Sequence, residues 1–367
     1  MNKYLKTILN SKIFLKYVVS GNSIRENDVH INNAVTWLLN SQKEVGSIGY
    51  AHSYNFVHSW QDAYPETTGY IIPSLLDVYR KNNKIEIYNS VELAVKWLKK
   101  IQNADGSFND LNGKKQIFDV GQILIGFNYL YQFYSEFKIK DNLLLSLNWL
   151  LSVQNEDGSF TKYSYNNIPH TYYSRVGAAV IKSGYLLNDK NIIEKGMKNI
   201  EWTMKMQLKN GFFKYSSFSN HDPYLHTMIY ILEGLFDAYE LTQEDRIFKS
   251  ILKFSNKLLE ISIRDGILYS QYDENYNISN KEYCMTGLAQ WVGICYKIFN
   301  VNNNVNYKID GDKTLDFVKL KQIVSSNKNL SGGIMGSIPF YGKYMGYSIP
   351  NWGIKFFIDA LLEEEKC

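Results

Sequence analysis

A short pattern recurs along the chain and constrains its fold more than any other feature. A tryptophan is followed five residues later by a glutamine and nine residues later by a glycine. Weaker copies end at Gly266 and at Gly332 or Gly333, so the six repeat ends stand roughly 50 to 70 residues apart. An internal period of this size predicts a repeat architecture. The four full copies are Trp37/Gln42/Gly46, Trp97/Gln102/Gly106, Trp149/Gln154/Gly158 and Trp202/Gln207/Gly211.

Each interval between glycines holds two segments with apolar residues at the period of an α-helix. After Gly106 these are "DVGQILIGFNYLYQFY" and "NLLLSLNWLLSVQ", and the second ends at the next Gln and Gly. We therefore expect one helical hairpin per repeat, with the glycine as a left-handed cap at the helix C-terminus. Six such hairpins close into an all-α (α/α)6 toroid, in which an outer barrel of helices wraps an inner one. We expect a single domain over residues 1–367, with an N-terminal helical extension at 1–30 and the six repeats at 31–367.

The composition excludes several classes of partner. The chain is 45% hydrophobic and 21% charged, and its net charge of +4 is spread without a basic stripe, so nucleic acid is not an expected partner. The three cysteines are too few for a disulfide framework and fit a reducing compartment.

The N-terminal segment lacks the continuous apolar core of a signal peptide and is too polar to span a bilayer, which predicts a cytoplasmic protein. It also has the pattern of an amphipathic helix, which would either dock on the core or contact a membrane surface. The apolar residues of this pattern are Leu5, Ile8, Leu9, Ile13, Phe14 and Val18.

Two parts of the sequence resemble known families, one through the repeat motif and one through two longer stretches. The motif Gln-x-x-Asp-Gly-Ser-aromatic, at Gln102–Phe108 and Gln154–Phe160, resembles the repeat of the squalene cyclase and protein prenyltransferase superfamily. The resemblance implies a structural brace, in which Gln ties helix ends together, and it indicates fold better than function. The stretches "AYPETTGYIIP" and "GSIPFYGKYMGYSIPNWGIKFFIDALL" resemble bacterial prenyltransferase-like proteins associated with surface-polysaccharide gene clusters. This second resemblance implies a glycan, a lipid-linked sugar or a sugar nucleotide as substrate.

The toroid predicts where a ligand would bind. If the first helix of each repeat is inner, all six inner helices begin at one mouth, near Tyr64, Phe118, His170, His226, Tyr283 and Tyr347. Helix N-termini carry partial positive charge, which favours an anionic ligand. The 29 Tyr and 7 Trp fit a sugar, because their rings stack on pyranose faces, although many of them would simply pack the core.

Removal of a proton next to a carboxylate requires a base, an acid and a group that neutralises the carboxylate. The residues that we expect to be catalytic are Glu66, His170, His226, Tyr230 and Tyr283. His226, Tyr230 and Glu233 share a helical face, and Arg175 needs a carboxylate partner, either Glu66 or Asp119 of the protein or the substrate itself. The residues that we expect to bind substrate are His58, Asp62, Tyr64, Asp119, Tyr173, Arg175, Glu233, Tyr347, Asn351 and Trp352.

These residues predict an enzyme of bacterial surface-glycan metabolism, of the capsule or lipopolysaccharide. The expected reaction is C5-epimerisation or β-elimination on an acidic sugar, without metal or cofactor. The segment "HDPYLHTMIYILEGLFDAYEL" is loosely similar to the helical part of glucuronyl C5-epimerases. Glycoside hydrolysis by paired carboxylates, drawn from Asp62, Glu66, Asp119 and Asp222, is the second interpretation.

Two further interpretations remain. A terpene cyclase would need an Asp-x-Asp-Asp motif, which does not occur, and a protein prenyltransferase would need a zinc site. Glu282-Tyr283-Cys284 resembles part of such a site, but the sixth inner helix offers no histidine. A non-catalytic glycan-binding subunit would show a shallow mouth and a large exposed apolar patch.

Overall fold

The computed structural model describes residues 23–367 and is mostly helical, as the sequence predicts. The amphipathic pattern of residues 5–18 lies outside the described part. The chain forms two compact units. The first contains residues 23–64, 74–94 and 282–367, and the second contains Pro65–Pro73 and Val95–Lys281.

Twelve α-helices lie within the described residues. They are α2 (Asn27–Glu44), α3 (Pro65–Asn82), α4 (Ile85–Ile101), α5 (Ile117–Phe133), α6 (Lys140–Val153), α7 (Ser174–Leu187), α8 (Lys190–Lys205), α9 (Leu225–Thr242), α10 (Asp245–Asp265), α11 (Met285–Asn302), α12 (Val305–Lys319) and α13 (Asn351–Glu364). The 3-10 turns are η1 (Ser135–Phe137), η2 (Tyr165–Asn167) and η3 (Thr171–Tyr173). The predicted inner helices correspond to α3, α5, α7, α9, α11 and α13.

Seven short strands lie in the loops, where the sequence predicted no regular structure. They are β1 (Ser53–Asn55), β2 (Ser59–Trp60), β3 (Gln271–Tyr272), β4 (Ile278–Asn280), β5 (Tyr283–Cys284), β6 (Ser337–Ile338) and β7 (Ser348–Pro350).

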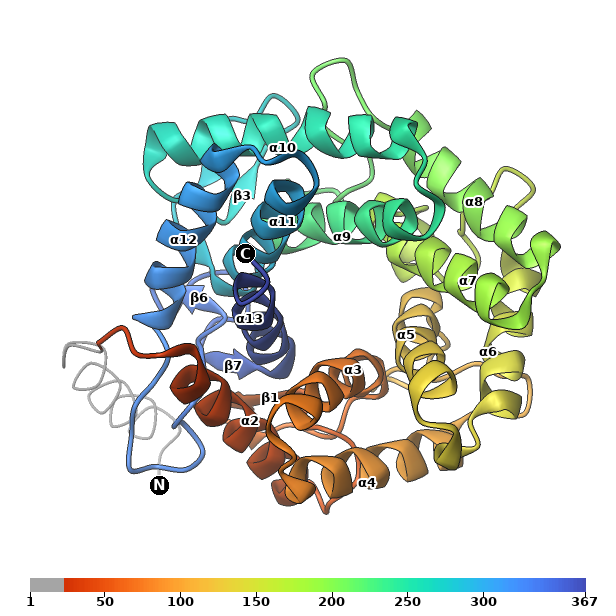
Figure 1. Cartoon of the computed structure of the whole chain (residues 1–367), viewed down its shortest axis with the longest axis horizontal. Helices are drawn as coiled ribbons and strands as arrows, with labels where there is room; N and C mark the ends of the chain where they lie inside the picture. Colours follow the sequence, from red (N-terminus) through yellow and green to blue (C-terminus); the bar gives the residue numbers. More distant parts are fainter. Residues whose placement is uncertain (1–22) are drawn as a thin grey trace. The chain divides into compact units, whose positions relative to one another are not determined.

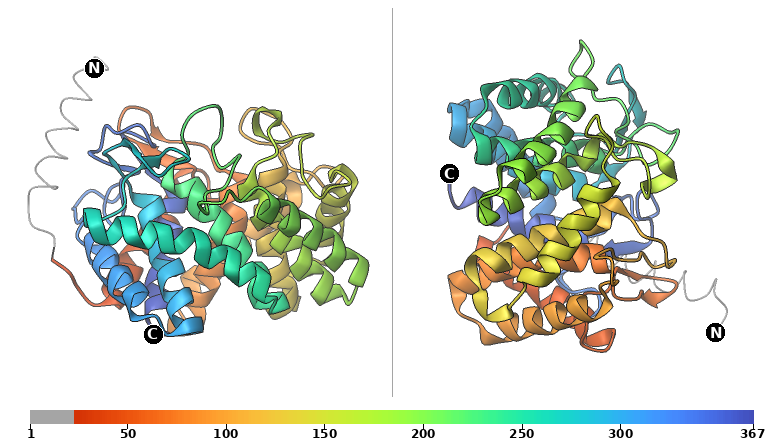
Figure 2. Two further views of the ribbon diagram at one scale, coloured as in Figure 1. Left: turned by 90° about the horizontal axis from the view of Figure 1, so that it is seen from above. Right: turned by 90° about the vertical axis from the view of Figure 1, so that its right-hand side faces the viewer.

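The second unit has two layers of helices. In the first layer α7 packs against both α5 and α9, and α6, α8 and α10 form the second layer (Figure 1). The burial patterns explain the layers. Nearly every residue of α9 from Leu225 to Leu235 is buried, whereas α10 buries one stripe, including Ile247, Ile251, Phe254 and Leu258, and exposes its charged side. A helix that is apolar on all sides is stable only when other elements surround it. The loops that lead into α5, α7 and α9 emerge at one end of this unit (Figure 2, left).

The six repeat glycines all have the left-handed backbone that the sequence predicts, with φ between 86° and 96°. Their role as helix caps is confirmed only for Gly266, which directly follows α10. Most of the others lie in turns several residues beyond the helix end. The left-handed caps belong instead to the predicted inner helices, where Asn83, Asn188, Gln243 and Asn303 follow α3, α7, α9 and α11. Asparagine tolerates this conformation because its short side chain bonds locally.

Four of these glycine turns touch the backbone of another helix. A methyl group added to Gly106 would lie 2.1 Å from the carbonyl oxygen of Leu145 in α6, and one added to Gly158 would lie 2.3 Å from that of Lys198 in α8. Gly211 and Gly332 meet α10 and α2 in the same way, whereas the space around Gly46 and Gly266 is open. Close backbone approach, as well as φ, therefore requires glycine at the four turns.

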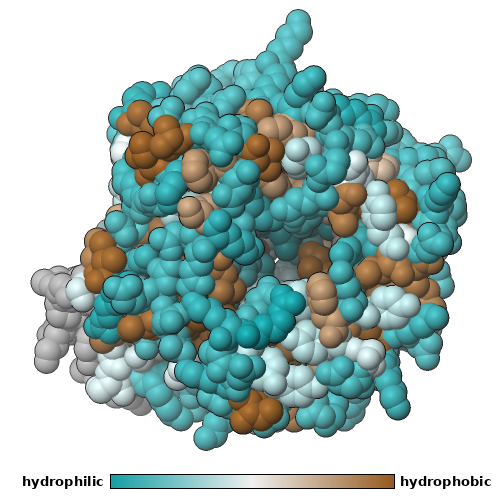
Figure 3. All heavy atoms as spheres, in the orientation of Figure 1, coloured by the Kyte–Doolittle hydropathy of each residue, from teal (hydrophilic) through white to brown (hydrophobic). Residues whose placement is uncertain are grey.

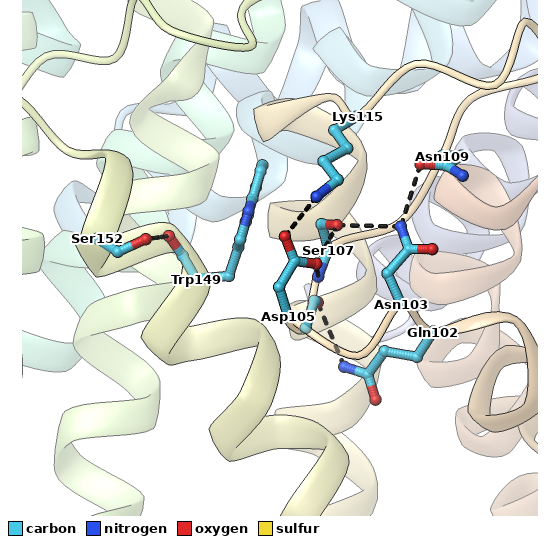
Figure 4. A network of polar contacts seen from close by, with 9 residues as sticks. Gln102, Asn103, Asp105, Ser107, Asn109, Lys115, Trp149 and Ser152 are labelled. Atoms are coloured by element: carbon cyan, nitrogen blue, oxygen red, sulfur yellow. Dashed lines mark hydrogen bonds and ion pairs between the residues drawn. The ribbon is translucent and has the colours of Figure 1, made fainter.

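A glutamine holds each of these turns in place, which confirms the expected brace. The Nε2 of Gln154 donates to the carbonyl of Gly158 at 3.1 Å and to that of Lys195 in α8 at 3.0 Å. Gln102 donates to the carbonyl of Gly106 in its own turn at 3.3 Å (Figure 4) and to that of Asn142 in α6 at 2.9 Å. In the first unit, Gln322 joins Gly332 to His30 of α2. The sequence analysis missed Gln322 because it stands ten residues before its glycine, not four.

The first unit also joins segments that are far apart in the sequence. Here α13 packs against α2 and α11, and α12 packs against α11. Strand β1 pairs with β2 and with β7, both antiparallel, so that Ser53 lies opposite Pro350. None of the helices within residues 23–367 has the length and apolar character needed to cross a membrane.

The two glycine environments predict different costs of substitution. Gly266→Ala should lower the free energy of unfolding by about 1 kcal/mol. An alanine there would adopt an unfavourable left-handed φ but would contact no neighbouring atom. Gly158→Ala has the same φ of 91° but also meets the α8 backbone, so it should cost about 2 kcal/mol more. Urea titrations of both variants measure the difference, and equal costs would contradict the close-packing argument.

Candidate functional site

A buried ion pair lies at the centre of the polar residues of the second unit. Arg175, in the first turn of α7, is 4% exposed and pairs with Glu233 of α9. Its Nε donates to the side-chain oxygen of Gln122 in α5 at 2.8 Å. Burial is the largest single influence and would lower the pKa of Arg175, but the charges of Glu233 and its neighbours together outweigh it and the pKa is raised. The sequence analysis expected Glu66 or Asp119 as the protein partner, and the structure shows Glu233 in this role.

Two tyrosines lie against this guanidinium. Its carbon is 4.9 Å from the centre of the Tyr230 ring and 5.8 Å from that of Tyr70, and the two hydroxyls are 3.3 Å apart. The His226 ring lies 4.2 Å from the Tyr230 ring, one turn earlier in α9. Because Glu233 and Tyr230 both contact Arg175, the predicted shared face of His226, Tyr230 and Glu233 is confirmed.

The Glu66 carboxylate affects three tyrosines of this site. Burial raises the pKa of Tyr70, Tyr172 and Tyr230 well above 10, and repulsion by Glu66 raises each further. Glu66 is itself 8% exposed, in the first turn of α3. At neutral pH these phenols therefore keep their protons and act as hydrogen-bond donors.

Aromatic rings from α5, η3 and α9 pack together beside Arg175. The Phe118 ring lies 5.3 Å from Tyr172, 5.8 Å from Tyr173 and 5.2 Å from Tyr230. Asp119, the next residue, is buried. Burial is the main cause of the raised pKa of Tyr173, to which Asp119 adds, while the hydrogen bond from the backbone of Tyr165 lowers it.

We call these residues the Arg175 cluster: Glu66, Tyr70, Phe118, Asp119, Gln122, Tyr172, Tyr173, Arg175, His226, Tyr230 and Glu233. Sequence reasoning missed Tyr70, Phe118, Gln122 and Tyr172. The spacing held a signal for two of them, because Tyr70 stands four residues after Glu66 and Gln122 three after Asp119, on the same helix faces.

His170 lies beside the cluster and is 1% exposed. Its ring stacks on Tyr172 at 4.6 Å, and its Nε2 is 2.9 Å from the carbonyl oxygen of Tyr165. Burial lowers the pKa of His170, so the imidazole is neutral at pH 7. The catalytic role that the sequence suggests for His170 stays a prediction.

The remaining predicted residues belong to the first unit. Rings of Tyr64 and Trp352 flank His52 at 5.3 and 4.7 Å, and the Asn351 amide donates to the carbonyl of Ala51 at 2.8 Å. His58 and Asp62 are exposed in the loop around β2, and Tyr347 has a left-handed φ of 59° before β7.

Tyr283, which the sequence predicts to be catalytic, belongs to the first unit. It lies in β5, and its ring packs on Phe317 of α12 at 5.2 Å. Glu282 accepts a hydrogen bond from the backbone of Lys343, and the thiol of Cys284 is buried. No three His, Cys, Asp or Glu side chains of residues 23–367 gather as a metal site would require.

Removal of one partner of the buried ion pair should destabilise the protein more than removal of both. Arg175→Met should lower the free energy of unfolding by about 3–5 kcal/mol, because the largely buried Glu233 carboxylate loses its guanidinium partner. Adding Glu233→Leu should recover part of the loss. The matched control is Arg246→Met, which removes two ion pairs at the surface, with Glu201 and Glu244, and should cost less than about 1 kcal/mol. Equal effects of the two arginine substitutions in urea unfolding would contradict this assignment.

His52 predicts a pH dependence of stability. Burial lowers its pKa from 6.5 to about 4, so the unfolded chain binds a proton at a higher pH than the folded one. Its contribution to stability is thus full above pH 6.5 and is lost as the pH falls toward 4. His52→Gln should flatten the fall in unfolding free energy over this range. Curves of equal slope for the variant and the wild type would exclude this role.

Comparison with known proteins shows the fold. Among proteins of curated function, none matches this chain in sequence. A heparin-specific unsaturated glucuronyl hydrolase has a similar structure, with a TM-score of 0.72 and 13% identity over 93% of this chain and 97% of that one. Cellobiose 2-epimerase from Bacillus thermoamylovorans has a TM-score of 0.73 and 13% identity over 92% and 98%. A D-mannose isomerase has a TM-score of 0.70 and 10% identity over 93% and 97%.

The family model described as the prenyltransferase alpha-alpha toroid domain matches residues 8–213 and 147–340, which together cover most of the chain. The match agrees with the helical repeats, glycine turns and glutamine braces described above. The predicted all-α toroid class is confirmed. The chain is therefore a member of the prenyltransferase alpha-alpha toroid domain family.

Proposed function

We propose that the protein is an enzyme that acts on an acidic sugar by acid–base chemistry in the Arg175 cluster. The observation that carries the proposal is the buried Glu66 carboxylate, whose charge acts on the protonated phenols of Tyr70, Tyr172 and Tyr230. A proton acceptor beside fixed proton donors is the arrangement that general acid–base catalysis requires.

Each residue of the cluster has a role in this proposal. Glu66 removes the proton next to the sugar carboxylate, and Tyr230 donates a proton or a hydrogen bond on the other side of the reacting carbon. His226 lies against Tyr230 and exchanges protons with it. Arg175 acts as a positioning residue, because its guanidinium is committed to Glu233 and lies 4.9 Å from the centre of the Tyr230 ring.

The sugar carboxylate needs another partner, since Arg175 is occupied. The N-termini of α5, α7 and α9 have no hydrogen bond from a capping side chain. The first N–H groups of α5 and α9 bond to the carbonyls of Tyr163 and Ser270, and α7 continues from η3, so the proposed attraction for the anion is the partial positive charge of these helix starts. By contrast, Asp189 caps the second-layer helix α8. The expected reaction is therefore C5-epimerisation or β-elimination of a uronate in surface-glycan metabolism.

The similar structures support a sugar as substrate. They are an unsaturated glucuronyl hydrolase, a cellobiose 2-epimerase and a D-mannose isomerase, and each of these proteins acts on a sugar. The low sequence identity means that this support concerns the substrate class and not the reaction.

Hydrolysis of a glycosidic bond is the second candidate. Glu66 and Asp119 are both buried, and they act on Tyr172 and Tyr173, whose rings are 5.1 Å apart. A pair of carboxylates that flanks a sugar ring suits a glycosidase. A scaffold role has less support, because hydrophobic residues form only small separate groups on the face in Figure 3.

The first experiment is incubation in heavy water with glucuronate, UDP-glucuronate and uronate tetrasaccharides, followed by mass spectrometry. We expect deuterium at the carbon next to the carboxylate, and Glu66→Gln should slow its incorporation by about 100-fold or more. The matched control Glu244→Gln changes a half-buried glutamate of the same unit, paired with Arg246, and should leave the rate unchanged.

The other outcomes separate the candidates. Oligosaccharide cleavage that incorporates 18O from labelled water at the new reducing end would favour hydrolysis, provided that no deuterium enters at carbon in heavy water. Exchange that continues at the wild-type rate in Glu66→Gln would contradict the assignment of Glu66.

A further inference from the structure

Two loops of the second unit line an open cavity of about 660 Å³ that none of the roles above uses. One loop, residues 110–116, leads into α5, and the other, residues 163–167, leads toward α7. The volume is within the ~300–1,000 Å³ of sites that hold small molecules.

The lining of this cavity suits a sugar. Tyr165 is 49% exposed and meets Phe218 edge to face at 6.1 Å, which leaves much of its ring at the surface. Tyr163 is 36% exposed, with the Lys162 ammonium 5.1 Å from its ring centre and the Trp149 ring at 5.6 Å. The amides of Asn112, Asn166 and Gln116 add hydrogen-bond donors and acceptors. Exposed aromatic faces beside amides match the alternating apolar and hydroxyl surfaces of a pyranose.

The charge of the lining favours an acidic sugar. The Asp110 carboxylate is occupied by the backbone N–H groups of Asn112 and Lys114, at 2.8 and 2.9 Å, and by the Gln116 amide at 3.3 Å. Lys115 pairs with Asp105 (Figure 4). The ammonium of Lys114 has no side-chain or backbone partner among residues 23–367. The Asp110 carboxylate keeps its negative charge, because its donors are neutral, so the positive charge that can contact an acidic sugar is local to Lys114.

The second loop holds an unusual backbone conformation. Tyr163, Asn166 and Asn167 all have left-handed φ angles, of 63°, 56° and 55°. The Tyr163 carbonyl accepts the N–H of Ile117 at 3.0 Å, and the Asn166 amide donates to the Phe218 carbonyl at 3.1 Å. Backbone that neighbouring elements hold in sparsely populated regions is concentrated at ligand sites.

The same loop contacts the proposed catalytic site. The backbone N–H of Tyr165 donates to the Tyr173 hydroxyl at 3.1 Å, and its carbonyl contacts His170. A ligand in the cavity therefore binds next to residues that border the Arg175 cluster.

We propose that this cavity is a subsite for a further sugar of an acidic oligosaccharide, with Tyr163 and Tyr165 as stacking faces and Lys114 as the contact for a carboxylate. This inference rests on the proposed function. It makes that function more specific, because it names a chain of sugars as the substrate instead of a single sugar or a sugar nucleotide.

Calorimetric titration tests the subsite separately from catalysis. The Glu66→Gln protein serves as background, so that turnover does not consume the probe. The probes are tetragalacturonate, a hyaluronan tetrasaccharide, neutral cellotetraose and glucuronate. We expect at least one acidic tetrasaccharide to bind more tightly than glucuronate and cellotetraose, with an affinity that falls as salt is raised.

The variants are Lys114→Met and Tyr165→Ala, with Lys190→Met as the control at an exposed lysine of the same unit. Each of the first two should weaken tetrasaccharide binding about fivefold or more and leave glucuronate binding unchanged, while the control has no effect. Circular dichroism checks that Tyr165→Ala is folded. Tetrasaccharide affinity that neither variant changes would overturn the subsite, as would a lack of binding by both acidic tetrasaccharides. Neither result would affect the deuterium exchange that tests Glu66.

Discussion

The close approach of glycine turns to the backbone of another helix is the contact on which the repeat structure depends. At Gly106, Gly158, Gly211 and Gly332 there is no room for a side chain, and a glutamine bonds the turn to the helix that it touches. Backbone groups at a helix end need partners, and the glutamine amide reaches both the turn and the next helix. Successive hairpins are thereby held at a fixed spacing, which places the starts of α5, α7 and α9 near one another.

The Arg175 cluster follows from this spacing. Once three helix starts of the first layer converge, the residues in their first turns face a common interior, and polar groups there must bond to one another. Arg175 and Glu233 neutralise each other, and the tyrosine rings exclude water from them. The same low-polarity surroundings that favour the ion pair hold the phenols in their protonated form.

Much of the fold was predictable because the repeat is a local signal. The tryptophan, glutamine and glycine spacing locates the hairpins, and the helical period locates the inner helices close to their observed starts. The site was harder to predict. His226, Tyr230 and Glu233 share one helix, so their proximity follows from periodicity. Tyr70 and Gln122 reach the same site from other helices, and the partner of Arg175 depends on how those helices pack. The asparagine caps were missed because a single left-handed residue has only a weak signature.

The pairing of β1 with β7, together with the contact of Gln322 with α2, has a consequence for the order of folding. The first unit is assembled from segments at opposite ends of the described chain, whereas most of the second unit is one continuous segment. During synthesis, residues 95–281 can pack on one another while residues 282–367 have not yet been made. Helix α2 and strand β1 cannot pack against α13 and β7 until those segments have been synthesised. Until then, the face of α2 that α13 covers is exposed to water. The long sequence separation of these contacts makes closure of the first unit the slow step on the ribosome and the stage most open to chaperone binding.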